Sequence, residues 1–376
     1  MRRKAIILIL ALLAAFVASL SFISSAREGD LIVPSAAFSH VGHLSDYEPS
    51  LAGGPMDAPV FFFDSGKEGA TVFIAGGAHP NESAGILSAI LVMENIEVSS
   101  GRVIVMPVMN LSAYSETLAG FGYPERYQIG GRSFKIGSRN TRQVDQWPDP
   151  FIFFQYPSGQ GLSYEESRNI NRAFPGKEGG SLTQRAALAI MKLLEDEGVD
   201  YAFDLHEASV TYPVNQTIVT SDGHYDVAYL ASLLLQEAGH DMRAEVSAAG
   251  NEGYTHRAWN GIEGLSAFLI EVPTPFIDRI PGAMTASLVT SGQDDFLHRL
   301  AERGLTTIDY PQEGIALSRR VAMHLDTMAT ILSVAQAFGG PSAELSWPSG
   351  EDIEANGLEA YLHSPEGSRT VLSTLM

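Results

Sequence analysis

The chain has 376 residues, of which 45% are hydrophobic and 18% are charged, a composition that excludes a disordered chain and fits a folded domain with a large core. Its formal net charge of −20 has the wrong sign for nucleic acid or for an anionic membrane surface. It has no cysteine, which excludes disulfides, thiolate ligands, a cysteine nucleophile and a lipid-modified cysteine. Any metal must therefore be held by His, Asp and Glu.

The amino terminus has the parts of a secretory signal peptide. Basic residues at 2–4 precede a 19-residue apolar run, 5–23, and small residues follow at 24–26. The pattern predicts cleavage after Ala26, which makes residues 1–26 a leader. The alternative is an uncleaved anchor, because the run approaches the ~17–25 residues that span a bilayer. In both cases we expect an exported protein, periplasmic or secreted, that contacts a membrane only through residues 5–23.

Strands and helices alternate along most of the chain after an entry segment, 27–59, that has one or two short strands. Apolar runs predict strands at 71–75, 102–108, 200–205, 216–220 and 265–272, and periodic segments predict helices at 83–94, 182–197, 228–238 and 316–338. The alternation predicts an α/β fold with a mixed, largely parallel central sheet covered by helices on both faces. We expect a main domain at 60–340 and a C-terminal extension at 341–376. Sites in such sheets gather at the carboxyl ends of the strands.

A long insertion, 114–166, interrupts this alternation and is rich in aromatic residues. One interpretation is a lid or binding loop, and the other is an inserted hairpin with a small core of its own. Its aromatic side chains include Phe121, Tyr123, Tyr127, Trp147, Phe151, Phe153, Phe154 and Tyr156. Its basic side chains could favour an anionic substrate, although a solvated face is the simpler interpretation for most of them. They are Arg126, Arg132, Lys135, Arg139 and Arg142.

His79 and Glu82 form a short motif with the chemistry of a metal site. They follow a predicted buried strand, and a His and a Glu three residues apart can hold one divalent cation. Alone, such a pair is more often an exposed histidine beside a helix-starting glutamate. His206, at the end of another predicted strand, supplies a third ligand if the two strands are neighbours. Together the three predict a His₂Glu zinc site with an open position.

Glu271 and the pair Asn171-Arg172 add two further pieces. Glu271 is flanked by apolar residues of a predicted core strand, so its carboxylate should be hydrogen-bonded, paired or functional. It could act as a general base or belong to a structural ion pair. Asn171 and Arg172 stand just before a Phe-Pro-Gly turn, where an amide and a guanidinium could clamp a carboxylate or simply cap the turn.

In combination, these residues resemble the M14 zinc metallocarboxypeptidase superfamily, and more closely its succinylglutamate desuccinylase/aspartoacylase branch. The resemblance spans residues 79–271, and nothing after residue 275 contributes to it. It rests on the ordered set His79-x-x-Glu82, Asn171-Arg172-x-Phe174-Pro175-Gly176, Asp204-Leu205-His206 and Glu271. It implies a zinc carboxypeptidase-like fold with one Zn²⁺ per chain, bound by His79, Glu82 and His206.

The resemblance also implies roles for residues around the metal. Glu271 is expected to be the general base and later the proton donor. Asn171 and Arg172 are expected to hold the substrate carboxylate.

Three further roles depend on weaker matches. An arginine upstream of the Asn-Arg pair is expected to polarise the scissile carbonyl. We choose Arg168, with Arg139 and Arg142 of the insertion as alternatives. Tyr254 is expected to close over the substrate, and Arg257 to add a second carboxylate contact.

One position departs from the pattern that this superfamily commonly shows. Its members have Asp two residues before the Asn of the pair, and Asn169 stands there in this chain. Asn169 can still accept the imidazole proton of the first ligand histidine, but it cannot raise the basicity of that ligand as a carboxylate does. A lower metal affinity is the expected result.

The leading hypothesis is an exported zinc hydrolase that cleaves an amide bond next to a free carboxylate, using zinc-activated water and Glu271 as the general base. Its substrate is either an N-acyl amino acid, which the motifs favour, or a peptide with a free carboxyl terminus, which the leader favours. Cell-wall peptides belong to the second class if the organism is bacterial. The alternative is a non-catalytic zinc- or ligand-binding member of the same fold, and a purely structural secreted domain is the third possibility.

Overall fold

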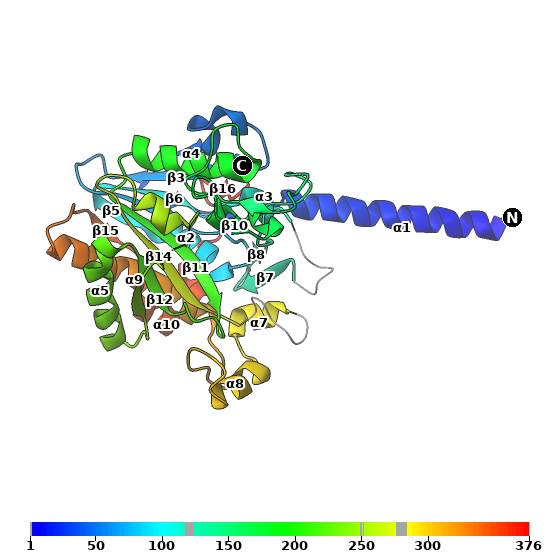
Figure 1. Ribbon diagram of the computed structural model, residues 1–376. Coiled ribbons are helices and arrows are strands. Elements are labelled where there is room, and N and C mark those ends of the chain that lie inside the picture. Colours follow the sequence, from blue (N-terminus) through cyan, green and yellow to red (C-terminus); the bar gives the residue numbers. More distant parts are fainter. Residues whose placement is uncertain (1, 117–123, 249, 251, 276–283, 376) are drawn as a thin grey trace.

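An eight-stranded mixed sheet runs through the centre of the protein (Figure 1). The computed structural model describes residues 2–116, 124–248, 250, 252–275 and 284–375. In sheet order the strands are β13 (Arg243–Val246), β12 (Thr217–Thr220), β14 (Ser266–Thr274), β11 (Tyr201–Ser209), β4 (Thr71–Ala75), β6 (Arg102–Met106), β3 (Pro59–Asp64) and β2 (Phe38–His43). The four central strands β14, β11, β4 and β6 are parallel, whereas β12 and β3 pair antiparallel with this group. The predicted fold class is confirmed.

Helices cover both faces of the sheet. On one face α2 (Ser83–Asn95) packs on β4 and β11, and α9 (Leu317–Ala337) packs on β11 and β14. α5 (Tyr225–Glu237) and α10 (Gly350–Asn356) pack in turn on α9. On the other face α6 (Thr255–Trp259) packs on β11, β12 and β14. The remaining helices of the globular part are α3 (Leu111–Tyr114), α4 (Leu182–Asp196), α7 (Ala286–Ser291) and α8 (Asp295–Glu302).

Two strands run further than the sequence predicts. β4 pairs with β11 only as far as Asp204, whereas β11 and β14 continue side by side to Ser209 and Thr274. His206 and Glu271 therefore lie inside strands and not at strand ends. Both residues still project beyond the carboxyl end of β4, the edge at which ligands gather in parallel sheets.

The segments before and after the main domain pack against it. β2 belongs to the central sheet, and β1 (Leu31–Ile32) pairs with β16 (Leu372–Ser373) near the carboxyl terminus. β5 (Glu97–Ser100) pairs with β15 (Glu344–Ser346). The domain limits at 59 and 340 remain a prediction.

The described part of the insertion forms short hairpins. β7 (Arg126–Ile129) pairs with β8 (Arg132–Lys135), and β9 (Phe153–Phe154) pairs with β10 (Gly161–Leu162). Tyr127 and Phe134 are buried in the main core, so the described part has no separate core. Trp147, Phe151 and Phe154 are exposed. Phe121 and Tyr123 lie outside the described residues.

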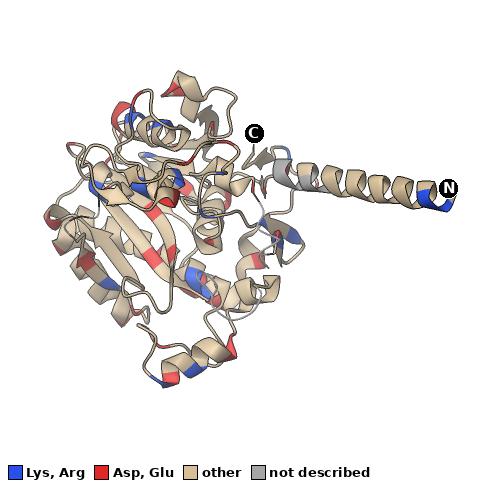
Figure 2. Ribbon diagram, turned by 45° about the vertical axis from the view of Figure 1, so that its right-hand side comes forward, with Lys and Arg blue, Asp and Glu red and all other residues tan. Residues whose placement is uncertain are grey.

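The first helix, α1 (Arg2–Arg27), projects away from the domain (Figures 1 and 2). An 18-residue window, Arg3–Leu20, has a mean hydropathy of 2.2 and is not buried. Figure 2 shows basic residues at its outer end and no acidic residue along it. By length and composition this helix could cross a membrane, and a signal peptide has the same properties.

Candidate metal centre and active site

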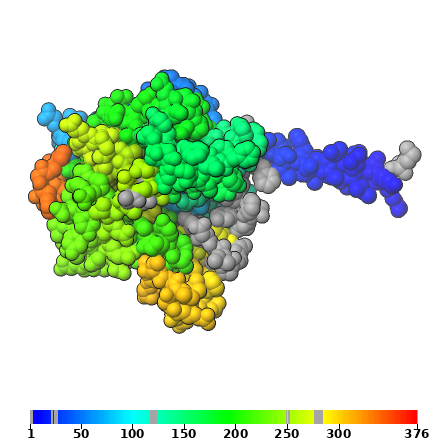
Figure 3. All heavy atoms as spheres, in the orientation of Figure 1, coloured from blue at the N-terminus to red at the C-terminus, as the bar shows by residue number. Residues whose placement is uncertain are grey.

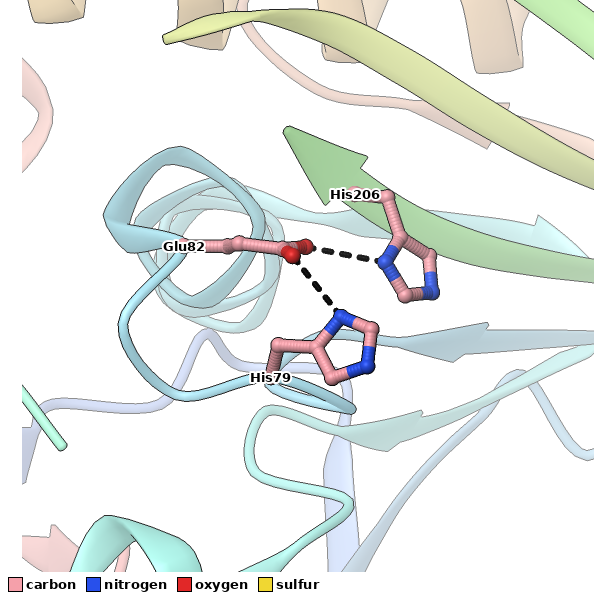
Figure 4. Close-up of side chains that lie close together, drawn as sticks. All are labelled: His79, Glu82 and His206. Carbon is pink, nitrogen blue, oxygen red and sulfur yellow. Dashed lines mark hydrogen bonds and ion pairs between the residues drawn. The ribbon is translucent and has the colours of Figure 1, made fainter. Parts of the chain in front are cut away.

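The three predicted metal ligands converge at the carboxyl edge of the sheet (Figure 4). His79 and Glu82 lie on the turn between β4 and α2, and His206 lies on β11. The Glu82 carboxylate bridges the histidines, with Oε1 2.7 Å from His79 Nδ1 and Oε2 2.8 Å from His206 Nδ1. One ligand atom from each residue lies within 4.8 Å of the others, and all three side chains are buried.

Two glycines let the chain turn sharply enough to bring His79 and Glu82 together. A Cβ at Gly76 would lie 2.6 Å from the carbonyl oxygen of Gly85 in α2, so only glycine allows this approach. Gly77 has a φ of +60°, in the left-handed region. Glu82 then stands as the N-cap of α2, where the positive end of the helix dipole favours a negative charge.

The outer nitrogen of each histidine has its own acceptor. His79 Nε2 lies 2.9 Å from Asn169 Oδ1, and His206 Nε2 lies 2.8 Å from Asp204 Oδ2. The expectation that Asn169 accepts from His79 is confirmed. The role of Asp204 was missed, although its spacing of two residues from His206 on a strand already places both side chains on one face. These acceptors orient both rings so that the Nδ1 atoms face Glu82.

The charges of these groups depend strongly on one another. Burial alone would raise the pKa of Glu82, but the neighbouring histidines hold it well below its ordinary value. Burial alone would lower the pKa of His206, but the carboxylates of Asp204 and Glu82 raise it well above its ordinary value. Burial lowers the pKa of His79.

This donor set fits a divalent cation such as Zn²⁺. Two imidazole nitrogens and one carboxylate oxygen point at the same space, and zinc in hydrolytic enzymes commonly has this set with a further position open. His206 would have to lose its Nδ1 proton to bind the ion. Metal binding should therefore release a proton.

Glu271 lies beside the ligand cluster. It is the register partner of His206 in the parallel pair β11–β14, so both side chains project from the same face. Its Oε2 is buried and has no hydrogen-bond partner among the described residues. Burial raises the pKa of this carboxyl to about 8. A buried carboxyl oxygen without a partner is costly, and such sites are frequently functional.

A buried ion pair behind the site was not predicted from the sequence. Glu207 follows His206 on β11 and points to the opposite face, where it pairs with Arg320 of α9, and both side chains are fully buried. The Glu207 carboxylate also accepts from the N–H of Ala84 at 2.8 Å, and the Glu207 N–H donates to Glu82 Oε2 at 3.1 Å. The Glu207 carboxylate therefore fixes the start of α2, and the main-chain N–H of the same residue holds the Glu82 carboxylate against β11.

The structure places Arg139, and not Arg168, at the ligand cluster. The Arg139 guanidinium donates to Glu82 Oε1 at 3.2 Å and is 39% exposed. Arg168 instead donates to Asp149 and to the carbonyl oxygen of Thr141, so it is engaged in holding the insertion. The choice of Arg168 therefore disagrees with the geometry. Sequence spacing could not decide between the two because the path of the insertion was unknown.

The other arginines of the insertion are not a solvated face. Arg126 pairs with Asp30, Arg132 with Glu94, and Arg142 with Asp145. The expected excess of positive charge is therefore largely neutralised by local acidic partners.

The expected substrate-binding residues divide into two groups. Asn171 is buried at the site, with its Oδ1 accepting from the N–H of Thr255 at 2.9 Å. The guanidinium of Arg172 stacks on the ring of Tyr254 with its Cζ 3.9 Å from the ring centre. Arg257 is turned toward Glu252 and the carbonyl oxygen of Ala248. The structure thus gathers Asn171, Arg172 and Tyr254, but it places Arg257 in a separate local pair.

Searches against family models and against curated proteins find no match. Solved structures do match. An aspartoacylase family protein from Mesorhizobium loti is 20% identical over 65% of each chain, with a TM-score of 0.37. A metallo-carboxypeptidase from Burkholderia cenocepacia is 11% identical over 85% of this chain and 68% of its own, with a TM-score of 0.45. A succinylglutamate desuccinylase from Silicibacter is 15% identical over 78% of this chain and 64% of its own, with a TM-score of 0.39. The chain spans about two thirds of the length of these solved structures.

The buried pair Glu207–Arg320 leads us to expect a loss of both stability and zinc affinity when Arg320 is replaced. Replacing Arg320 with Met should lower the free energy of unfolding by about 3–5 kcal/mol, because it leaves the charge of Glu207 buried without a partner. Zinc affinity should fall as well, because the Glu207 carboxylate accepts from the N–H of Ala84 and so fixes the start of α2, next to Glu82. Urea unfolding and zinc titration calorimetry measure the two effects, and Arg320→Lys tests the same contact if the Met variant fails to fold.

Arg319→Met is the matched control. The neighbouring Arg319 forms an ion pair with Glu354 in which the side chains are 35% and 48% exposed, so its loss should cost no more than about 1 kcal/mol. Equal losses in the two Met variants would contradict a special role for Arg320.

Glu271 predicts a pH dependence in the metal-free protein. A pKa raised from 4.5 to about 8 means that the folded state holds its proton more tightly than the unfolded state. This contribution to stability is complete below pH 4.5 and is lost as the pH rises toward 8, at no more than about 1.4 kcal/mol per pH unit. Urea unfolding at several pH values should show a flatter decline in Glu271→Gln than in the wild type. Parallel curves would contradict the assignment.

Proposed function

We propose that the protein is a zinc-dependent hydrolase that cleaves an amide bond adjacent to a free carboxylate. The observation that carries this proposal is the buried convergence of His79, Glu82 and His206 beside Glu271, whose buried Oε2 has no partner among the described residues. A purely structural role gives no reason to bury so many titratable groups around one point.

The chain supplies the proton carrier of this reaction. Zn²⁺ bound by the three ligands would act as a Lewis acid toward a water molecule and the scissile carbonyl. Glu271 takes the proton of the attacking water and returns it to the leaving nitrogen. Its raised pKa in the metal-free state suits a group that must hold a proton during part of the cycle, and a nearby cation would lower that pKa.

We assign to Arg139 the role of polarising the scissile carbonyl, for which the sequence analysis chose Arg168 and kept Arg139 as an alternative. Its guanidinium is anchored to Glu82 and still 39% exposed, so it can reach a substrate at the cluster. A fixed positive charge there stabilises the negative charge that develops on the carbonyl oxygen.

Asn171 and Arg172 are suited to hold the substrate carboxylate. The stacking on Tyr254 restrains the guanidinium of Arg172, which limits the entropy lost when it binds an anion. An N-acyl amino acid and the carboxyl end of a peptide share this recognition element. Export through α1 would favour peptides, and the motifs favour N-acyl amino acids. The alternative, a non-catalytic binding protein of the same fold, is supported only by Asn169 beside His79.

Metal analysis followed by a substrate panel tests the proposal. We expect one zinc per chain, hydrolysis of N-acyl amino acids or of peptides with a free carboxyl terminus, and little hydrolysis of amidated peptides. Glu271→Gln should retain zinc and lower kcat by about 10²–10⁴-fold. Absence of zinc after reconstitution would refute the hydrolase assignment. Equal rates on amidated peptides would refute the carboxylate clamp.

The two arginines predict different kinetic outcomes. Arg139→Met should lower kcat/KM by about 10²–10³-fold, because it removes a charge that acts on the carbonyl oxygen. Arg168→Met should mainly lower the thermal midpoint, because it frees Asp149 and the carbonyl oxygen of Thr141. Steady-state kinetics and thermal unfolding of both variants decide the point. The reverse pattern would restore Arg168 as the polarising residue.

A further inference from the structure

The insertion carries an exposed apolar surface that the proposed chemistry does not use. We define the apolar patch as Val144, Trp147, Phe151, Ile152 and Phe154. Phe151 is 101% exposed, Val144 75%, Trp147 72% and Phe154 64%. Among the described residues outside α1, these four are the most exposed of the large apolar side chains. Water-facing aromatic clusters of this kind mark interaction surfaces.

A chain of hydrogen bonds connects the segment that carries the apolar patch, residues 144–154, with the base of α1. Asp30, three residues after α1 ends, donates through its N–H to Thr374 Oγ1 at 2.8 Å. Thr374 donates to Tyr114 Oη of α3 at 3.1 Å, and Ser112 of the same short helix donates to Asp145 at 2.6 Å. Asp145 directly follows the first residue of the patch. In Figure 3 the teal and green atoms of the insertion adjoin the base of the blue helix.

The helix α1 limits how far the domain surface around its base can lie from a bilayer. If α1 crosses a bilayer, the two residues between its end and Asp30 reach no further than about 10 Å, even when fully extended. The surface around the base of α1 is then held within that distance of the membrane surface. The insertion, which carries the apolar patch, adjoins the base of α1 in Figure 3.

We propose that the apolar patch enters the interfacial layer of the same bilayer that α1 crosses. Trp and Phe side chains are favoured at that depth because their rings bury apolar area among the headgroups. A hollow of about 580 Å³ adjoins the patch and is lined by Trp147 and Phe154 together with Lys177, Arg185 and the acidic Asp145. Lys177 lies over the ring of Tyr156, and Arg185 donates to Ser50. Two cations beside the patch suit a lipid phosphate, in a chain whose overall charge is −20.

This second contact would fix how the domain sits on the membrane. A domain attached through a single helix can rotate about the helix axis. A second contact through the patch would keep the same face of the domain against the membrane. The insertion that bears the patch also bears Arg139, so the candidate active site would be held at a constant position relative to the membrane. The proposal goes beyond the proposed hydrolysis and does not depend on it.

Tryptophan quenching in the full chain tests the proposal directly. The chain has three tryptophans, of which Trp259 is buried and Trp347 is half-buried in the carboxyl-terminal part. With the protein reconstituted in phosphatidylcholine vesicles, lipids brominated near the headgroup should quench part of the emission. That quenched part should disappear in Trp147→Phe. The wild type without quenching, or equal quenching in both proteins, would overturn the proposal.

A second variant keeps the test independent of Trp147 itself. Phe151→Ser with Phe154→Ser should reduce the quenching of Trp147 and shift its emission to the red, while the thermal midpoint and zinc content stay unchanged. Emission that instead depends on protein concentration and not on brominated lipid would identify a second copy of the chain as the occupant and overturn the membrane contact. Recovery of a processed, unquenched protein lacking α1 would also overturn it.

Discussion

The buried negative charge of Glu82 is the constraint on which the rest of the site depends. The side chain is 2% exposed, and a carboxylate in such a place is stable only if donors surround it. Its four donors come from three parts of the chain: His79 from the turn, His206 and the N–H of Glu207 from β11, and Arg139 from the insertion. Satisfying one carboxylate thus positions the turn, a core strand and the insertion at once.

The alternation of side chains along β11 connects this site to the core. Asp204 and His206 point to the face where α6 and the ligand cluster lie, and Glu207 points to the face covered by α2 and α9. The strand therefore carries the candidate metal site on one side, and on the other side the ion pair that supports it. Glu207 and Arg320 can be buried only together, because either charge alone would lack a partner. The same pair lies in the core and supports the start of α2 beside the site, so a change in one affects the other.

The sequence predicts the features that depend on local spacing. The strands, the helices and the pair His79-Glu82 are encoded within a few residues, and Asp204 could have been added from its spacing to His206. The pairing of Glu207 with Arg320 spans 113 residues and depends on how α9 crosses the sheet. The position of Arg139 depends on the path of the insertion, which has no clear period. Those features required the tertiary structure.

The side chain of Asn169 connects two parts of the site that the sequence treats as separate motifs. Its Oδ1 accepts from His79 and from the N–H of Asn171, so one amide orients both a candidate metal ligand and the start of the proposed carboxylate clamp. Its Nδ2 donates to Glu166 at 2.8 Å. An aspartate at this position would set two carboxylates against each other at that distance. The asparagine at position 169 therefore suits the glutamate at position 166, because its amide donates to a carboxylate that an aspartate would repel.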